Sequence, residues 1–339
     1  MRKKLEFQAD RIDEVMSLHK VPARVTGGTV TPRWVRFQVL PAVGTKISRI
    51  KNLSEELAAA LDAPSSRVSR HGASVFIEIP RDDPQPVRLL PLLSQLFNQP
   101  TSQPPIPPVT AILGLAEDGS PLLIRLPSPD VGHILIAGNK GAGKTTLLQT
   151  IILSLALTDR LDNLAFVFLG DGLRLTMEMV LRLGFSAYRI EGLGMAVLRA
   201  GIAAAGKRII VVADNVTGDS HTSIGRLAYM MRSQPKRQRH YILAWLGVPP
   251  PEVVNLFQVR LVGRMDNVEN ANKATGWMGT GAERLLGGGD FLAVAEGTAN
   301  RFQAADVTFA GFQKINNKTI RSLHLPSPIN RLALGQGKV

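Results

Sequence analysis

The chain has 339 residues, and 45% of them are hydrophobic, so it is long enough for two domains and apolar enough to bury a core. This composition excludes a disordered chain, and a sequence without cysteine excludes disulfides and thiolate metal sites. Lysine and arginine outnumber aspartate and glutamate by 40 to 27, and the net charge of +13 favours an anionic partner, nucleic acid first and a membrane surface second.

The N-terminus does not have the pattern of a targeting signal. Residues 1–10 are basic but lack the apolar stretch of a signal peptide. The longest uncharged apolar run near the middle, residues 145–158, is shorter than the roughly 20 residues that a membrane-spanning helix needs. We therefore expect a soluble, cytoplasmic chain without a membrane segment.

A helix and a small α/β domain are predicted for the first 98 residues. Apolar residues at helical spacing predict an N-terminal helix within residues 1–20. Alternating apolar runs separated by turn residues predict an α+β pattern over residues 21–98. The predicted elements are strands at 34–40 and 75–80, a helix over 47–63 with Ser54 as its N-cap, and a helix at 89–97.

A proline-rich segment then divides the chain. Residues 99–108 contain five prolines, which predict a stiff, extended linker and a domain boundary. Apolar strands alternate with helices over residues 109–315, and this βαβ rhythm predicts a parallel sheet covered by helices, the α/β class. Residues 316–339 are predicted to form a C-terminal tail. The predicted strands are at 133–138, 164–171, 208–215, 240–247 and 259–264.

The strand predicted at 133–138 leads into GNKGAGKTT, which matches the phosphate-binding pattern G-x-x-x-x-G-K-[ST], the Walker A motif or P-loop. Glycines allow backbone N–H groups to turn towards phosphates, and the N-terminus of the following helix adds its dipole. Lys144 is expected to reach the β- and γ-phosphates of ATP, and Thr145 is expected to bind Mg²⁺. The predicted nucleotide-binding residues are Gly138, Asn139, Lys140, Gly141, Ala142, Gly143, Lys144, Thr145 and Thr146.

Acidic residues follow two of the later strands. We expect Asp214 to hold Mg²⁺ through water, although an acid in this place can also serve as a helix N-cap. Asp171 ends the strand before it, and a turn-forming role is its alternative. In P-loop ATPases the residue after the magnesium-side acid is often a glutamate that activates water, and here it is Asn215. Lys144, Asp214 and Asn215 are thus the expected catalytic positions.

Several motifs in a fixed order resemble the FtsK/SpoIIIE family of DNA translocases. The stretches that carry the resemblance are VGTKISRIKNLSEELAAAL before the linker, the approach to GNKGAGKTT, and GAERLLGGGDFL further on. The resemblance covers about residues 21–315. It implies a RecA-like P-loop motor, usually a ring of six subunits with double-stranded DNA in its pore. It also implies ATP between subunits and an arginine from the neighbour that stabilises the transferring phosphoryl group.

The chain departs from the family pattern at the catalytic positions. The family's Asp-Glu pair reads Asp214-Asn215, and its alanine-threonine-glutamine sensor reads Ala244-Trp245-Leu246. Asparagine cannot accept a proton at neutral pH, and loss of a general base typically costs ~10²–10⁴-fold in rate. These departures predict intact ATP binding and slow hydrolysis, unless another acid, Glu178 or Asp171, takes over the role of base.

The contacts that a neighbouring subunit and DNA would make are less sharply defined. The family's arginine falls on Asn272, so Arg260, Arg264 or Lys273 is expected to replace it. Basic clusters fit sequence-independent contact with phosphates, and solvated helix ends or subunit contacts are their alternatives. The predicted DNA-binding residues are Arg232, Lys236, Arg237 and Arg239, and the basic residues of the small domain are Lys46, Arg49, Lys51, Arg67 and Arg70.

Three functions follow from these patterns. The first is an ATP-driven motor of the FtsK kind that forms a hexameric ring and translocates double-stranded DNA. The second is a nucleotide-gated DNA clamp or scaffold with little or no turnover, favoured by Asn215 and Leu246. The third is a protein-translocating relative of the type VII secretion kind, against which the basic charge argues.

Overall fold

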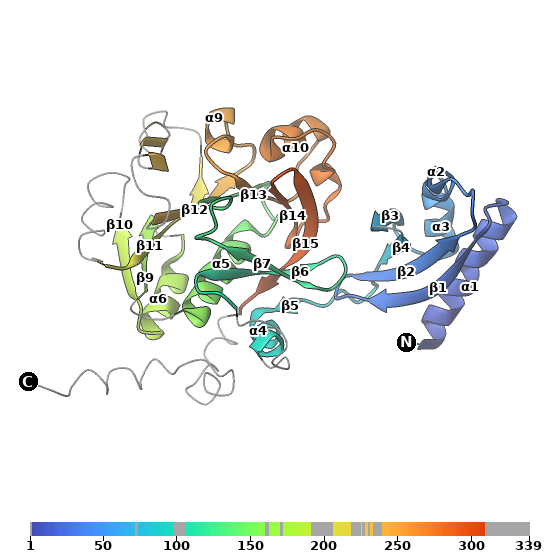
Figure 1. Cartoon of the computed structure of the whole chain (residues 1–339), viewed down its shortest axis with the longest axis horizontal. Helices are drawn as coiled ribbons and strands as arrows, with labels where there is room; N and C mark the ends of the chain where they lie inside the picture. Colours follow the sequence, from blue (N-terminus) through green and yellow to red (C-terminus); the bar gives the residue numbers. More distant parts are fainter. Residues whose placement is uncertain are drawn as a thin grey trace, which may run out of the picture. The chain divides into compact units, whose positions relative to one another are not determined.

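The structure is a computed structural model, and it forms two compact units, Met1–Pro86 and Val87–Val339 (Figure 1). Within its described residues, no helix combines the length and apolar character needed to cross a membrane. The described residues are 2–71, 74–97, 106–159, 163–169, 172–190, 206–217, 225, 228–229, 231–232 and 239–308.

The first unit is an antiparallel sheet of four strands in its described part, with the order β1-β2-β4-β3. Helices pack on one face of this sheet, where Ile12, Ile50 and Leu57 meet Phe37 and Ile77 in one core. The elements are α1 (Arg2–Leu18), β1 (Ala23–Val30), β2 (Trp34–Pro41), α2 (Ile47–Lys51), α3 (Ser54–Ala60), β3 (Arg67–His71) and β4 (Ser74–Pro80).

The other face of β2 and β4 carries a buried charge cluster. Arg36 Nε donates to Glu78 Oε1 at 2.7 Å, and the guanidinium of Arg36 lies 4.4 Å from the ring centre of Phe76. Arg67 also binds Glu78, and its guanidinium lies 5.7 Å from the ring centre of Trp34. One carboxylate therefore holds two arginines, and the ring of Trp34 packs against one of them.

One local prediction for this unit is wrong. The predicted helix over 47–63 is two short helices, α2 and α3, and Ser54 is the first helical residue and not the N-cap. Leu53 occupies the cap position without a side-chain cap, while the Ser54 hydroxyl donates to the carbonyl oxygen of Lys51 at 2.7 Å. The serine thus bonds backwards to the preceding helix, a local competition that serine side chains often offer.

The second unit is built on a mixed sheet that has 11 strands in the described residues. Six of them are parallel, in the order β10-β9-β11-β12-β8-β13, and the antiparallel strands β14-β15-β6-β7 continue the sheet. The parallel strands are β8 (Ile134–Gly138), β9 (Leu164–Leu169), β10 (Ser186–Ile190), β11 (Arg208–Val216), β12 (Arg239–Leu246) and β13 (Val259–Val262). This confirms the predicted α/β class with a large, mostly parallel sheet.

The remaining elements of this unit surround the parallel part of the sheet. Strand β5 pairs with β15, in the same direction. The strands are β5 (Val87–Arg88), β6 (Thr110–Ala116), β7 (Pro121–Arg125), β14 (Asp290–Ala295) and β15 (Thr298–Asp306). The helices are α4 (Leu89–Phe97), α5 (Lys144–Thr158), α6 (Arg174–Arg182), α9 (Pro251–Val254), α10 (Val268–Thr275) and the short 3₁₀ turn Ala282–Arg284.

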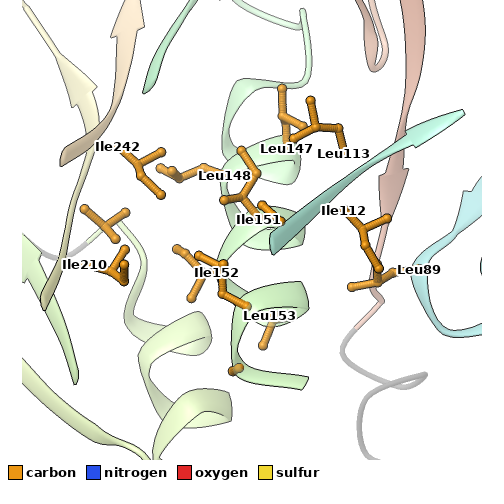
Figure 2. Packing of buried hydrophobic residues seen from close by; sticks show 14 of the residues in the cluster. Leu89, Ile112, Leu113, Leu147, Leu148, Ile151, Ile152, Leu153, Ile210 and Ile242 are labelled. Carbon is orange, nitrogen blue, oxygen red and sulfur yellow. The ribbon is translucent and has the colours of Figure 1, made fainter. Parts of the chain in front are cut away.

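Helix α5 is the centre of the larger core. It is apolar on almost every side, as a helix surrounded by protein should be. Figure 2 shows it with Ile210 and Ile242 of the parallel strands on one side and Ile112 and Leu89 on the other. Each fully buried leucine or isoleucine contributes about 1.5–3 kcal/mol. This packing fixes the helix whose first turn carries Lys144.

Residues 87–97 pack in the second unit, although the sequence analysis assigned them to the small domain. Strand β5 forms its ladder with β15, and Leu89, Leu92 and Leu93 of α4 enter the core around α5. Similarly, α1 contributes to the core of the first unit and is not a separate helix. Residues 98–105 and 309–339, with most of the predicted linker and tail, lie outside the described residues.

A buried histidine gives the second unit a pH dependence. His240 is fully buried in β12, and its Nδ1 lies 2.7 Å from the carbonyl oxygen of Gly132. Burial lowers the pKa of His240 to about 4; the Gly132 hydrogen bond opposes this shift and the charge of Arg208 adds to it. Between pH 6.5 and 4 the imidazole of His240 is therefore protonated in the unfolded chain and neutral in the folded chain.

We expect this difference in proton binding to lower the unfolding free energy of the second unit by about 3 kcal/mol as the pH falls from 7 to 4. The loss begins near pH 6.5 and is complete near pH 4. Urea unfolding at four pH values, compared between the native chain and His240→Gln, measures it. Equal slopes of stability against pH in the two proteins would contradict the assignment.

Candidate nucleotide-binding site

The sequence GNKGAGKTT forms the connection between β8 and α5, so the phosphate-binding pattern has the strand–loop–helix setting that it requires. Three glycines have positive φ, Gly138 at 154°, Gly141 at 83° and Gly143 at 98°. Gly143 is also the N-cap of α5, whose first-turn N–H groups have no partner within the helix. Loop and helix end together offer backbone donors to an anion.

Lys144 is 6% exposed, and its Nζ donates to the carbonyl oxygen of Asn139 at 2.9 Å. Burial lowers the pKa of the ammonium, and the carboxylate of Asp214 opposes that shift. The Lys144 ammonium therefore bonds to a carbonyl of its own loop and is partly removed from water. A phosphate bound here would place further negative charge beside it.

Thr145 and Asp214 meet beside the loop. The hydroxyl of Thr145 donates to Asp214 Oδ2 at 2.8 Å, which joins the first turn of α5 to the end of β11. The ladder between β11 and β12 shifts its register between Ala213 and Val216, so the two residues between them form a bulge. In this bulge Asn215 has φ of 52° and is exposed, and its N–H donates to Asp214 Oδ1 at 2.9 Å.

The sensor position lies on the strand between these elements. Strand β12 is the neighbour of both β8 and β11, and Leu246 pairs with Gly138 at the start of the loop. Trp245 is buried in the core, whereas Leu246 is 42% exposed. An exposed apolar side chain therefore stands where the family pattern has a polar one.

Further contacts that the sequence analysis missed support the loop. The side-chain amide of Asn139 donates to Asp266 Oδ1 at 2.6 Å, and its backbone N–H donates to the carbonyl oxygen of Arg264 at 3.0 Å. Gly288 N–H donates to the carbonyl oxygen of Gly141 at 3.1 Å, and Gly289 N–H donates to that of Ala142 at 2.9 Å. The GGGD stretch was the signal that could have indicated this contact.

The close approach of residue 289 requires glycine at position 143. A Cβ on Gly143 would lie 2.7 Å from Gly289 N, in addition to the strain of its φ. We expect Gly143→Ala to displace the loop and weaken ATP binding by about tenfold or more. Gly141→Ala is the matched control, because its φ is 83° but no atom lies within 4 Å of the added Cβ. Isothermal titration of both variants measures the difference, and equal losses would contradict it.

The other predicted residues lie in different surroundings. Arg260 is partly buried on β13, its Nε has no hydrogen-bond partner among the described residues, and burial lowers its pKa. Arg264 is exposed next to the loop of its own chain, since its carbonyl oxygen accepts the N–H of Asn139 at 3.0 Å. Glu178 lies on α6 with Oε1 3.5 Å from Arg174 Nε.

Some predicted residues fall outside the described part of the chain. Asp171 is one of them, although the next residue, Gly172, lies beside Asp214: a Cβ on it would be 3.6 Å from Oδ2. Lys236 and Arg237 are also outside, while Arg232 is exposed and Arg239 begins β12. In the first unit, Arg67 binds Glu78.

The residues around the loop fit ATP and Mg²⁺. A polyphosphate suits this site, where a buried ammonium donates to a backbone carbonyl beside three glycines and the N-terminus of a helix. No cluster of three metal-ligating side chains exists in the described residues. Mg²⁺ needs none, because it is usually held by one or two protein oxygens together with phosphate and water. Thr145 and Asp214 would supply those oxygens.

Two family profiles match the sequence. The FtsK alpha domain matches residues 1–81, and the FtsK/SpoIIIE family matches residues 93–178. The chain thus carries an FtsK alpha domain followed by a domain of the FtsK/SpoIIIE family. The second match contains β8, the loop and α5, so the family assignment includes the candidate nucleotide-binding site.

Curated relatives of this family align with just under half of the chain. DNA translocase SftA of Bacillus subtilis is 33% identical over 155 residues, 44% of this chain and 16% of its own length. DNA translocase FtsK of Pseudomonas syringae pv. tomato is 32% identical over 164 residues, 45% of this chain and 20% of its own length. The aligned part thus spans about a fifth or less of these relatives' own length.

A solved structure extends the comparison to nearly the whole fold. The pCW3 conjugation coupling protein TcpA, solved as a monomer with ATPγS, has a TM-score of 0.51 and 15% identity. The match covers 93% of this chain and 99% of that chain. At this identity the likeness concerns the fold alone.

Proposed function

We propose that the chain is an ATP-binding motor subunit that forms a hexameric ring, encircles double-stranded DNA and translocates it by ATP hydrolysis. The observation that carries this proposal is the meeting of Lys144, Thr145 and Asp214 at the family's loop, with the net charge of +13 for a polyanion. The curated relatives are named DNA translocases, which supports DNA as the substrate.

Each residue of the site has a separate task in this proposal. The loop's N–H groups and the Lys144 ammonium bind the phosphates and offset the charge that develops during phosphoryl transfer. Mg²⁺ held by Thr145 and Asp214 would supply a Lewis acid at the phosphates. Thr145 and Asp214 are already paired at 2.8 Å, so both oxygens are directed to one place before ligand binds. Arg260 and Arg264 are the candidates for acting on a neighbour's nucleotide.

Hydrolysis is expected to be slow. Asn215 can orient a water molecule through its amide but cannot take its proton. The left-handed φ of 52° also favours asparagine over glutamate, because asparagine tolerates this region better than other non-glycine residues. The apolar Leu246 removes a polar contact to the γ-phosphate. These features favour a second candidate function, a nucleotide-gated DNA clamp with little turnover.

ATPase measurements with and without duplex DNA distinguish the two candidates. The motor proposal predicts slow turnover that duplex DNA stimulates at low salt and that rises with ring assembly. The clamp predicts nucleotide-dependent retention of DNA with no stimulated turnover. A chain that stays monomeric with ATP and ignores duplex DNA at low salt would contradict both. Electron microscopy with DNA and a non-hydrolysable ATP analogue would show whether a ring forms and what its pore holds.

A further inference from the structure

Three consecutive glycines, residues 287–289, which we name the glycine turn, lie against the phosphate-binding loop. The backbone N–H groups of Gly288 and Gly289 donate to the carbonyl oxygens of Gly141 and Ala142. In a trans peptide the N–H points opposite to the C=O. Fixing these two carbonyls therefore also fixes the direction of the N–H groups of the next residues. The Ala142 N–H donates to the carbonyl oxygen of Asn139 at 3.2 Å, so it is the Gly143 N–H through which the turn helps to direct the anion cradle.

The glycine turn cannot hold this conformation by itself. Its φ angles are 76°, 56° and 94°, all in the region of positive φ, which glycine adopts about as readily as negative φ. Two groups of β15 hold it: Gln303 Nε2 donates to the carbonyl oxygen of Gly288 at 3.2 Å, and Ala304 N–H donates to that of Gly289 at 2.7 Å. The turn therefore depends on the strand behind it.

A buried ion pair joins the end of the turn to the same strand. Asp290 is 3% exposed, and Arg301 binds it with both arms of its fork, Nε to Oδ1 at 2.8 Å and Nη2 to Oδ2 at 2.6 Å. The second oxygen also accepts the N–H of Leu286 at 2.8 Å, across the turn. Glu117 Oε1 lies 3.9 Å from Arg301 Nη1. A planar fork on a buried carboxylate fixes orientation as well as distance.

We propose that Asp290 and Arg301 are positioning residues for nucleotide binding: their ion pair fixes the glycine turn, and the turn fixes the phosphate-binding loop. This inference rests on the proposed function, in which the loop binds ATP. The chain of contacts runs from Arg301 to Asp290, to Gly288 and Gly289, and to the carbonyls of Gly141 and Ala142. A loosened turn leaves the loop's amides free to rotate, so binding pays an ordering cost that the native chain avoids.

The test uses two variants and one matched control on the full chain. Arg301→Met removes the fork. The double variant Asp290→Asn with Arg301→Met also removes the Asp290 charge that the single variant leaves unpaired, so it can be measured even if the single variant does not fold. Arg88→Met is the control, since Arg88 Nη1 contacts both carboxylate oxygens of Asp306 on the same strand, at 2.8 and 3.0 Å, in a more exposed ion pair. The readouts are the dissociation constant for ATPγS and hydrogen exchange of residues 138–146 without nucleotide.

We expect both variants to bind ATPγS about tenfold more weakly per folded molecule and to exchange the loop's amides faster, while the control changes neither. A structural role alone would lower the melting temperature and leave affinity per folded molecule unchanged, which would overturn the inference. Equal losses in the control would also overturn it. If the native chain binds no ATPγS, the proposed function fails. The positioning role is tested separately by hydrogen exchange of the loop, and it fails if native and variant chains exchange these amides at the same rate.

Discussion

Lys144→Ala is expected to lower ATP turnover at least about 100-fold and to weaken ATP binding, because the variant removes the cation that faces the β- and γ-phosphates. The ammonium is 6% exposed and donates to the loop carbonyl of Asn139 at 2.9 Å, so it is already in place before ligand binds. Its pKa is lowered by burial, and phosphate would reverse that penalty. The gain from bound nucleotide is therefore larger here than for an exposed lysine.

Lys140 is the matched control for this experiment. It lies in the same loop but is exposed, and the glycine after it has open space around it. Lys140→Ala is expected to change turnover by no more than about twofold, since an exposed charge is screened by solvent. Steady-state phosphate release of both variants, with and without duplex DNA, measures the contrast. If Lys140→Ala lost as much activity as Lys144→Ala, turnover would depend on the total positive charge of the loop and not on Lys144 in particular.

Much of the fold followed from short-range patterns. The apolar runs of β8, β11 and β12 and the long apolar run of α5 are buried on both sides, so their uninterrupted apolar character and their lengths were sufficient to place them. Strand β1 was missed because Gly27 and Gly28 interrupt its apolar alternation. Its register with β2 also shifts between Val25 and Gly27. Its stability comes from the neighbouring strand, which no local pattern reports.

The same distinction between local patterns and long-range contacts applies to the candidate site. The loop and its strand–helix setting are contiguous in sequence, so GNKGAGKTT identified them. The pairing of Thr145 with Asp214 joins positions 69 residues apart, and the family order of motifs indicated it. The contacts of the glycine turn are different: Gly289 and Ala142 are distant in sequence and interact only through backbone atoms. Backbone hydrogen bonds carry no residue signature except the glycines that permit the close approach.

Asn215→Glu is expected to raise ATP turnover by about 100-fold, the lower end of what a general base contributes, because Leu246 still lacks a polar contact to the γ-phosphate. The backbone sets a cost against this gain. Residue 215 has φ of 52°, where glutamate is strained by about 1 kcal/mol relative to asparagine. A glutamate that relaxes towards the β region would break the Asn215 N–H contact to Asp214 Oδ1, at 2.9 Å, and shift the magnesium-side carboxylate.

Asn215→Gln separates the proton from the geometry. Glutamine has the length of glutamate and the same strain at this φ, but it cannot accept a proton. If the base is what the chain lacks, glutamate raises turnover and glutamine does not, and the rate of the glutamate variant falls as the pH drops through the pKa of that carboxyl group. A rise with both would assign the effect to the shape of the bulge between Ala213 and Val216. The native chain could instead show robust, DNA-stimulated turnover with no gain from glutamate. That result would mean that another carboxylate already activates the water. Asp171 would then be the first position to replace, because the next residue, Gly172, lies against Asp214.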